Sequence, residues 1–183
     1  MQEKSAIVIE LNGNMEKSSR IAWEILDEKL NVNYIKDNSP CPHIALEYNF
    51  IHESDSFLDI LEDIKGACIP FKISAIGLGV FIKKTPVIHI RWSINNRFKL
   101  FRNKIKEVLI KANTNDIIEA YSPDNNWIPK TTLACYDTDY NNLNIALKYL
   151  EKIDFENELY IDKFSLYTYS KKNIEKKIKT FSI

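Results

Sequence analysis

Residues 41–50 read CPHIALEYNF and place His43 in a short run of alternating apolar side chains, directly after a proline. Residues 127–137 read WIPKTTLACYD and repeat that pattern, with Lys130 in the place of the histidine. In an extended strand, successive side chains point to opposite faces. We therefore predict that His43 and Lys130 each lie on the polar face of a strand whose other face is apolar.

Each of the two runs continues through a polar turn into a segment with apolar residues at helical spacing, which predicts a strand followed by an amphipathic helix. The two motif positions are 130 − 43 = 87 residues apart, close to half of the 183-residue chain. Such an internal repeat predicts two similar lobes related by a pseudo-twofold axis, with their equivalent strands next to each other. The polar faces of those strands would then line one shared cleft.

The rest of the chain alternates between the same two kinds of element. Alternating β-branched and apolar residues predict strands, and apolar residues at every third or fourth position predict helices. Two stretches rich in Asn, Asp, Ser and Pro, residues 31–42 and 113–126, predict loops. The predicted strands are residues 5–11, 43–48, 71–84, 86–94, 130–136, 158–170 and 176–183, and the predicted helices are residues 15–31, a helix that starts at Ser54, 96–112 and 140–153.

Composition limits the possible partners. Lys plus Arg and Asp plus Glu both number 25, so the net charge is zero and any recognition of phosphate must be local. The chain begins without a signal-like segment and has no apolar run near the ~18 residues of a membrane span, so a cytoplasmic protein is expected. The three cysteines lack metal-ligand spacing, and the four glycines do not form a phosphate-binding loop. We expect no metal, no cofactor and no membrane partner.

The repeated motif resembles that of the 2H phosphoesterases, which include the bacterial 2′-5′ RNA ligases and cyclic phosphodiesterases and carry one H-x-[ST]-[apolar] motif in each lobe. The likeness covers nearly the whole chain and rests on PHIAL at 42–46, GLGVF at 77–81, PVIHIRW at 86–92 and WIPKTTLA at 127–134. It implies an α+β fold with two lobes of antiparallel sheet and outer helices around a central cleft, in one domain of two interleaved lobes over residues 1–183. It also implies that one histidine is a general base, the other a general acid, and that the motif hydroxyls hold a phosphate.

The chain departs from that pattern at two positions. Lys130 replaces the second histidine and Ala45 replaces the first hydroxyl, whereas His43 and Thr132 match the pattern. A lysine has an ordinary pKa of about 10.4, so at neutral pH it is a good phosphate clamp and a poor proton shuttle. The missing hydroxyl removes a hydrogen bond worth about 0.5 to 1.5 kcal/mol. These two changes predict that catalysis is weak or lost.

Further candidates lie between and beside the motifs. Arg91 shares a strand face with His89 and is a candidate phosphate ligand, with an exposed surface charge as the alternative. Trp127 is a candidate for stacking on a base, with core packing as the alternative. We interpret His52 and His89 as structural because neither matches a motif. The predicted ligand-binding residues are His43, Lys130, Thr132, Arg91 and Trp127, and His43 and Lys130 are also the predicted catalytic pair if the cleft is active.

The sequence leaves three functions open. The first is a binding protein that holds a cyclic nucleotide or a small cyclic oligonucleotide and sequesters it, in the manner of a viral anti-defence sponge. The second is an active 2′,3′-cyclic phosphodiesterase or 2′-5′ RNA ligase-like enzyme that acts on RNA ends, with His43 as base and Lys130 as acid or electrostatic clamp. The third is a folded domain with a vestigial cleft and a protein partner. We rank the binding protein first.

Overall fold

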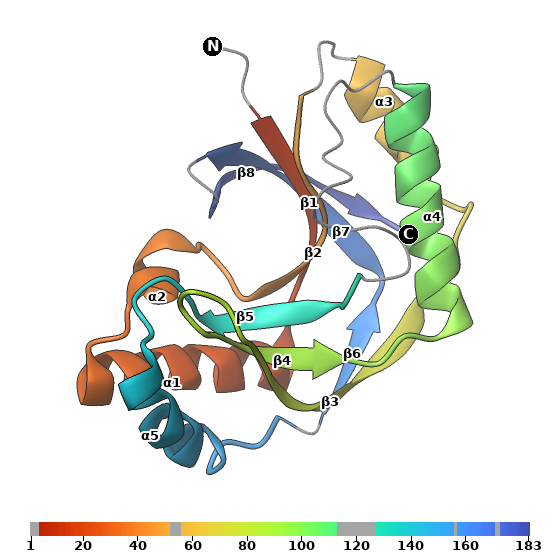
Figure 1. Cartoon of the computed structure of the whole chain (residues 1–183). Coiled ribbons are helices and arrows are strands. Elements are labelled where there is room, and N and C mark those ends of the chain that lie inside the picture. Colours follow the sequence, from red (N-terminus) through yellow and green to blue (C-terminus); the bar gives the residue numbers. More distant parts are fainter. Residues whose placement is uncertain (1–3, 52–55, 113–126, 156, 171–172) are drawn as a thin grey trace.

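The computed structural model describes residues 4–51, 56–112, 127–155, 157–170 and 173–183. Its strands form two four-stranded sheets in which every neighbouring pair is antiparallel. Helices pack on the outer sides of these sheets (Figure 1). The α+β class and the two-sheet architecture predicted from the sequence are confirmed.

The first sheet brings together both ends of the chain, and we call it the terminal sheet. Its strand order is β2-β1-β7-β8, so the lysine-rich C-terminal strand forms an edge. Lysines on an edge strand discourage pairing with another chain. The terminal sheet consists of β1 (Lys4–Glu10), β2 (His43–Ile51), β7 (Lys163–Ser170) and β8 (Asn173–Ser182).

The second sheet comes from the middle of the chain, and we call it the central sheet. Its strand order is β5-β4-β3-β6, and β3 and β4 are consecutive strands of a hairpin. The second motif strand is therefore an edge strand here, as the first motif strand is in the terminal sheet. The central sheet consists of β3 (Phe71–Phe81), β4 (Val87–Trp92), β5 (Lys130–Ala134) and β6 (Glu158–Ile161).

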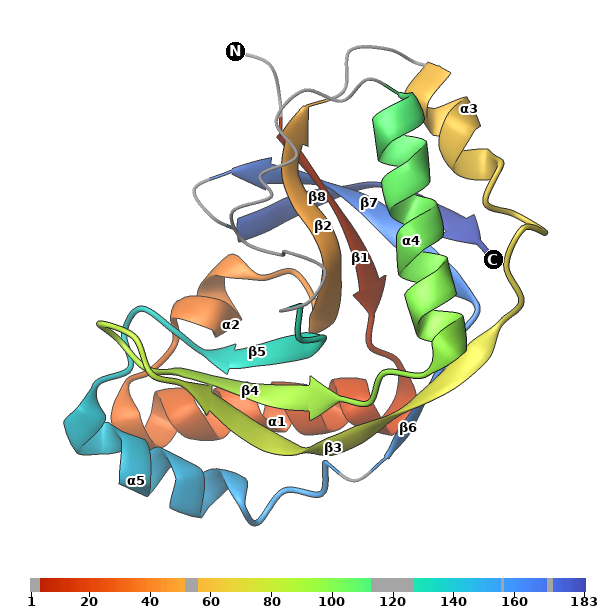
Figure 2. The same cartoon turned by 45° about the vertical axis from the view of Figure 1, so that its right-hand side comes forward.

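The longer helices divide between the two sheets. Helix α1 (Gly13–Leu30) packs against α5 (Tyr140–Leu150) and β5, on the outer side of the central sheet. Helix α4 (Asn96–Lys111) packs against α3 (Ser56–Glu62) and β2, beside the terminal sheet (Figure 2). No helix of the described residues is long and apolar enough to cross a membrane.

Local sequence fixes where two of these helices begin. The Asn95 side chain accepts a hydrogen bond of 2.9 Å from the Phe98 amide at the start of α4. The Asp139 side chain accepts one of 2.7 Å from the Asn142 amide at the start of α5. Each cap supplies a partner for an amide that the helix itself leaves unpaired, which stabilises a helix by about 1 kcal/mol.

The alternation of the motif strands determines which face is buried. Ile44 and Leu46 of β2 are buried in the main core, and so is Leu133 of β5. His43 and Lys130 are only partly buried. Burying one such aliphatic side chain contributes about 1.5 to 3 kcal/mol, so a shift of register by one residue would be strongly disfavoured.

Two predicted segments differ from the structure. Residues 31–42, predicted to be a loop, contain the short helix α2 (Tyr34–Asn38). Residues 158–170, predicted to be one strand, are β6 and β7, which belong to different sheets and meet at Asp162. The predicted loop at 113–126 lies outside the described residues, and the helix predicted to start at Ser54 is described from Ser56.

Candidate functional site

The two motif strands lie next to each other although they belong to different sheets. Strands β2 and β5 are in contact where the terminal and central sheets meet (Figure 2). His43 is the first residue of β2 and Lys130 is the first residue of β5. Burial lowers the pKa of His43, and the positive charge of Lys130 acts in the same direction.

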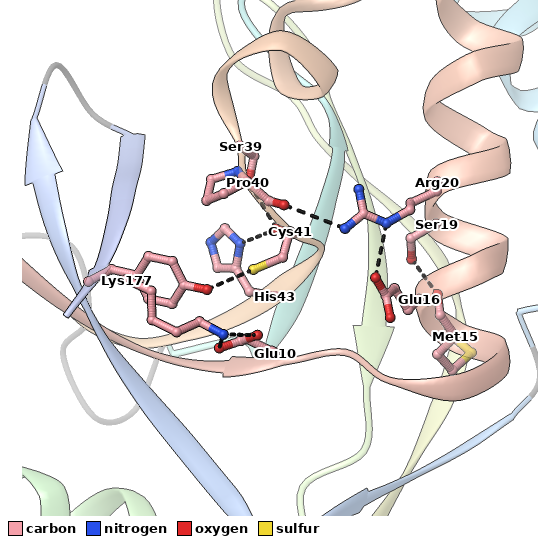
Figure 3. Close-up of polar contacts among 11 residues, drawn as sticks. Glu10, Met15, Glu16, Ser19, Arg20, Ser39, Pro40, Cys41, His43 and Lys177 are labelled. Atoms are coloured by element: carbon pink, nitrogen blue, oxygen red, sulfur yellow. Dashed lines mark hydrogen bonds and ion pairs between the residues drawn. The ribbon is translucent and has the colours of Figure 1, made fainter. Parts of the chain in front are cut away.

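The imidazole of His43 has a defined hydrogen-bonding state. Its Nδ1 lies 3.0 Å from the carbonyl oxygen of Cys41 (Figure 3). Because a carbonyl can only accept, Nδ1 carries the proton and Nε2 of the neutral ring is an acceptor. Burial is the main cause that lowers the pKa of His43 to about 4, and Lys130 acts in the same direction. At neutral pH the ring is therefore an uncharged base.

Glu10 is the cross-strand neighbour of His43, and no sequence motif includes it. Lys177 Nζ lies 2.7 and 2.8 Å from its two carboxylate oxygens, and the Ser165 hydroxyl donates to it at 2.6 Å (Figure 3 draws the lysine pair). Burial raises the pKa of Glu10, but the hydrogen bonds from Lys177 and Ser165 outweigh that effect and lower it. Glu10 is therefore an ionised neighbour of His43, and its carboxylate is bound by Lys177 and Ser165.

On the central sheet the strand register brings three predicted residues together. Lys130 lies directly opposite Arg91, and Thr132 lies directly opposite His89, across the β4–β5 pair. Residues that pair across two strands project from the same face, so all four side chains share one face of the sheet. Lys130 Nζ donates a hydrogen bond of 3.1 Å to the Thr132 hydroxyl.

This face carries unpaired positive charge. Lys83, in the turn between β3 and β4, lies close enough to Lys130 to affect its pKa. Burial is the main cause that lowers the pKa of Lys130, and the charge of Lys83 acts in the same direction. Lys83, Arg91 and Lys130 form no ion pair with any described residue. A chain with zero net charge thus has three cations near one another at this end of the central sheet.

Solved structures of other proteins share this architecture, although no protein-family model and no curated protein sequence matches the chain. E. coli LigT complexed with 3′-AMP superposes with a TM-score of 0.63 at 11% identity, over 100% of this chain and 99% of that one. TT0787 of Thermus thermophilus gives a TM-score of 0.65 at 15% identity, over 98% and 97% of the two chains. A protein described as a phosphoesterase gives 0.53 at 10%, over 100% and 99%.

This is the 2H phosphoesterase fold. His43 begins a strand of the terminal sheet and Lys130 begins a strand of the central sheet. Among the described residues, no group of three or more His, Cys, Asp or Glu side chains could hold a metal ion. The side chains that the 2H fold gathers here are suited to hydrogen bonding and to charge neutralisation of an anion.

Trp127 lies just before β5 and packs against α4. The guanidinium of Arg102 sits over its ring at 4.2 Å from the centroid, and the Phe98 ring meets it edge-on at 5.3 Å. The Arg102 guanidinium also lies 2.9 Å from the buried carboxylate of Glu47. These contacts occupy part of the indole, and stacking of a base on Trp127 stays a prediction.

The 2H fold of this chain should lose stability as the pH falls below neutral. His43 and His89 each have a folded pKa of about 4 against an ordinary value of 6.5. Between those pH values the unfolded chain binds protons that the folded chain does not, so the free energy of unfolding falls as the pH is lowered. We expect a loss on the order of 1 to 3 kcal/mol between about pH 7 and about pH 5 by urea unfolding.

The variant His89→Phe provides the matched control for this pH effect, because it removes one of the two depressed groups. Its free energy of unfolding should change less between the same two pH values. Carboxylates such as Glu10 lose their contribution to stability only at lower pH, below the ordinary pKa of 4.5. Equal pH slopes for the wild type and His89→Phe would contradict the assignment of the effect to His89.

Proposed function

We propose that this chain binds a phosphate-containing nucleotide, a cyclic nucleotide or a small cyclic oligonucleotide, where β2 meets β5, and holds it with little or no cleavage. The observation that carries this proposal is the group of three cations, Lys83, Arg91 and Lys130, that lack a carboxylate partner among the described residues. Lysine and arginine bind phosphate oxygens through charge-assisted hydrogen bonds. Thr132 adds a hydroxyl donor beside Lys130.

Structures of similar fold support a nucleotide ligand. E. coli LigT has been crystallised with 3′-AMP, with ATP, with NADP+ and with phosphate. Those four compounds share a phosphate group. In this chain, the group of Lys83, Arg91 and Lys130 is suited to bind a phosphate. RNA ends also carry phosphate and are a further ligand of this class.

The proposal of weak or absent cleavage rests on the residues at the motif positions. Ala45 offers no hydroxyl on the His43 strand, and Lys130 offers an ammonium in place of an imidazole. A cleft that holds an intact signalling nucleotide would act by sequestration. A viral anti-defence role is one setting in which such sequestration is useful.

A second candidate is an enzyme, and one observation favours it. Burial lowers the pKa of Lys130, which makes the ammonium a better proton donor than an exposed lysine. His43, neutral with Nε2 as an acceptor, is suited to be the base. The pair would then constitute a 2′,3′-cyclic phosphodiesterase or an RNA ligase-like enzyme.

Two variants of Lys130 test the binding proposal. Lys130→Ala should weaken binding of 2′,3′-cyclic AMP by about tenfold or more, because a hydrogen bond to a charged group is worth about 1.5 to 3 kcal/mol. Lys130→Arg keeps the charge and should bind within a few-fold of the wild type. Calorimetric titration measures both affinities.

The matched control is Lys104→Ala, which removes a lysine of α4 that pairs with Glu107. Its affinity should equal that of the wild type. If Lys130→Ala binds the nucleotide as tightly as the wild type does, the lysine is a bystander and the proposed site is wrong.

A further inference from the structure

His89 is a buried histidine with one unused nitrogen. Its side chain is 1% exposed, and its ring stacks on Phe81 with the ring centroids 4.2 Å apart. Its Nδ1 lies 3.3 Å from the carbonyl oxygen of Val87. Its Nε2 is buried and has no hydrogen-bond partner among the described residues. A buried acceptor without a partner costs about 1 to 3 kcal/mol, so this nitrogen calls for an explanation.

The ring of His89 is held in the same way as that of His43. In both, Nδ1 faces the carbonyl oxygen of the residue two positions earlier, Val87 or Cys41. A carbonyl accepts, so Nδ1 donates and Nε2 of the neutral ring is an acceptor in both cases. Burial lowers the pKa of His89 to about 4, and Lys130 and Arg91 act in the same direction. The described residues therefore include two neutral imidazoles with matching acceptors, although only one of them matches the sequence motif.

The position of His89 places this acceptor among the phosphate candidates. His89 lies opposite Thr132 in the β4–β5 register, two residues along the strands from the Arg91–Lys130 pair. On its other side it lies opposite Gly79 of β3. A Cβ at Gly79 would lie 2.6 Å from His89 Nε2 and 2.9 Å from Arg91 Cδ. The absence of a side chain there makes room for both the imidazole and the arginine stem.

The stem of Arg91 lies beside this nitrogen. A Cβ built on Gly79 would lie close to Arg91 Cγ and Cδ as well as to His89 Nε2. These three atoms therefore border the same small space. The Arg91 side chain is exposed and has no ion pair with a described residue. Exposed side chains change rotamer within nanoseconds, so Arg91 can turn toward a bound phosphate and leave space for a ligand atom beside Nε2.

We propose that His89 is a ligand-contacting, specificity-determining residue, whose Nε2 accepts a hydrogen bond from a hydroxyl next to the phosphate that Arg91 and Lys130 hold. Phosphate oxygens are themselves acceptors at neutral pH and do not satisfy Nε2. A ribonucleotide 3′-phosphate carries a suitable donor, the adjacent 2′-hydroxyl, and a deoxyribonucleotide lacks it. Of the nucleotides in the proposed function, those with a free hydroxyl beside the phosphate would gain this hydrogen bond, and a 2′,3′-cyclic phosphate, which has no such hydroxyl, would be held by Arg91 and Lys130 alone. This inference rests on the proposed function.

The test uses two probes, 3′-AMP and 2′-deoxyadenosine 3′-monophosphate, and measures their affinities by calorimetric titration. The wild type should bind the ribonucleotide about five- to tenfold more tightly, the effect of one hydrogen bond. His89→Phe should lower ribonucleotide affinity to that of the deoxyribonucleotide and leave the latter unchanged. Its melting temperature should stay equal or rise, because phenylalanine keeps the stack on Phe81 and removes a buried unpaired acceptor.

A second variant, His89→Gln, keeps an acceptor in the side chain and should retain only part of the preference for the ribonucleotide. A wild type that binds both probes equally, or a His89→Phe variant that keeps the full preference, would overturn the inference and leave the proposed function intact. Should His89→Phe not fold, His89→Gln decides: a reduced preference supports the inference, and a preference equal to that of the wild type overturns it. A wild type that binds neither probe would overturn the proposed function and this inference with it.

Discussion

The double variant Lys130→His with Ala45→Thr is expected to cleave 2′,3′-cyclic AMP about 10²-fold faster than the wild type, or more. A positioned general acid or base typically contributes 10² to 10⁴-fold, and an imidazole exchanges protons near neutral pH whereas an ammonium does not. His43 already has the neutral form and the acceptor Nε2 that a base needs. Ala45 shares the strand face of His43, so the added hydroxyl would reach the same ligand.

The measurement is the rate of ring opening of the cyclic phosphate, with each single variant as a control. Lys130→His alone should give most of the gain, and Ala45→Thr alone should give little, because it supplies a hydrogen bond and no proton transfer. Affinity should change less than rate. A wild type that cleaves well and a double variant that is slower would show that Lys130 is itself the acid, and the enzyme would replace the binding protein as the function.

The variant Arg102→Met is expected to lower the free energy of unfolding by about 3 to 5 kcal/mol. Arg102 of α4 and Glu47 of β2 form an ion pair of 2.9 Å with side chains only 5% and 9% exposed. Removing Arg102 takes a buried counter-charge away from Glu47, which is strongly destabilising. The variant also loses the contact of the guanidinium with Trp127.

Urea unfolding of three variants checks this account of the ion pair. Lys72→Met breaks the pair with Glu158, whose side chains are 61% and 59% exposed, and should cost less than about 1 kcal/mol. Replacing both Glu47 and Arg102 by apolar residues should cost less than Arg102→Met alone. A loss below about 1 kcal/mol for Arg102→Met would mean that the pair does little to hold α4 against β2.

Much of the fold could be predicted because its elements depend on local patterns. The alternation in β2 placed Ile44 and Leu46 in the core and His43 on the other face, and the structure agrees. The helix α2 was missed because it has five residues and depends on distant contacts: the Asp137 carboxylate accepts hydrogen bonds of 2.7 and 2.6 Å from the amides of Asn33 and Tyr34. A propensity pattern contains no such information.

The candidate site was harder to predict, because its additional residues come from other strands. Glu10 reaches His43 only through the β1–β2 register, and Lys83 reaches Lys130 only through the β3–β4 turn. His89 sits in an apolar strand, where a lone histidine is usually structural, and its unused nitrogen is visible only with the side chains in place. The alternation of side chains along a strand shows which face a residue lies on. The register between strands, which a single segment of sequence does not contain, decides which residues meet.

The most direct test of the central claim is the fate of 2′,3′-cyclic AMP bound by the wild-type protein. The protein is incubated with the nucleotide, the bound fraction is separated, and the nucleotide in it is identified by mass. The account predicts that the cyclic phosphate is bound and recovered intact. Recovery of the ring-opened monophosphate, or a bound fraction that contains no nucleotide, would contradict it.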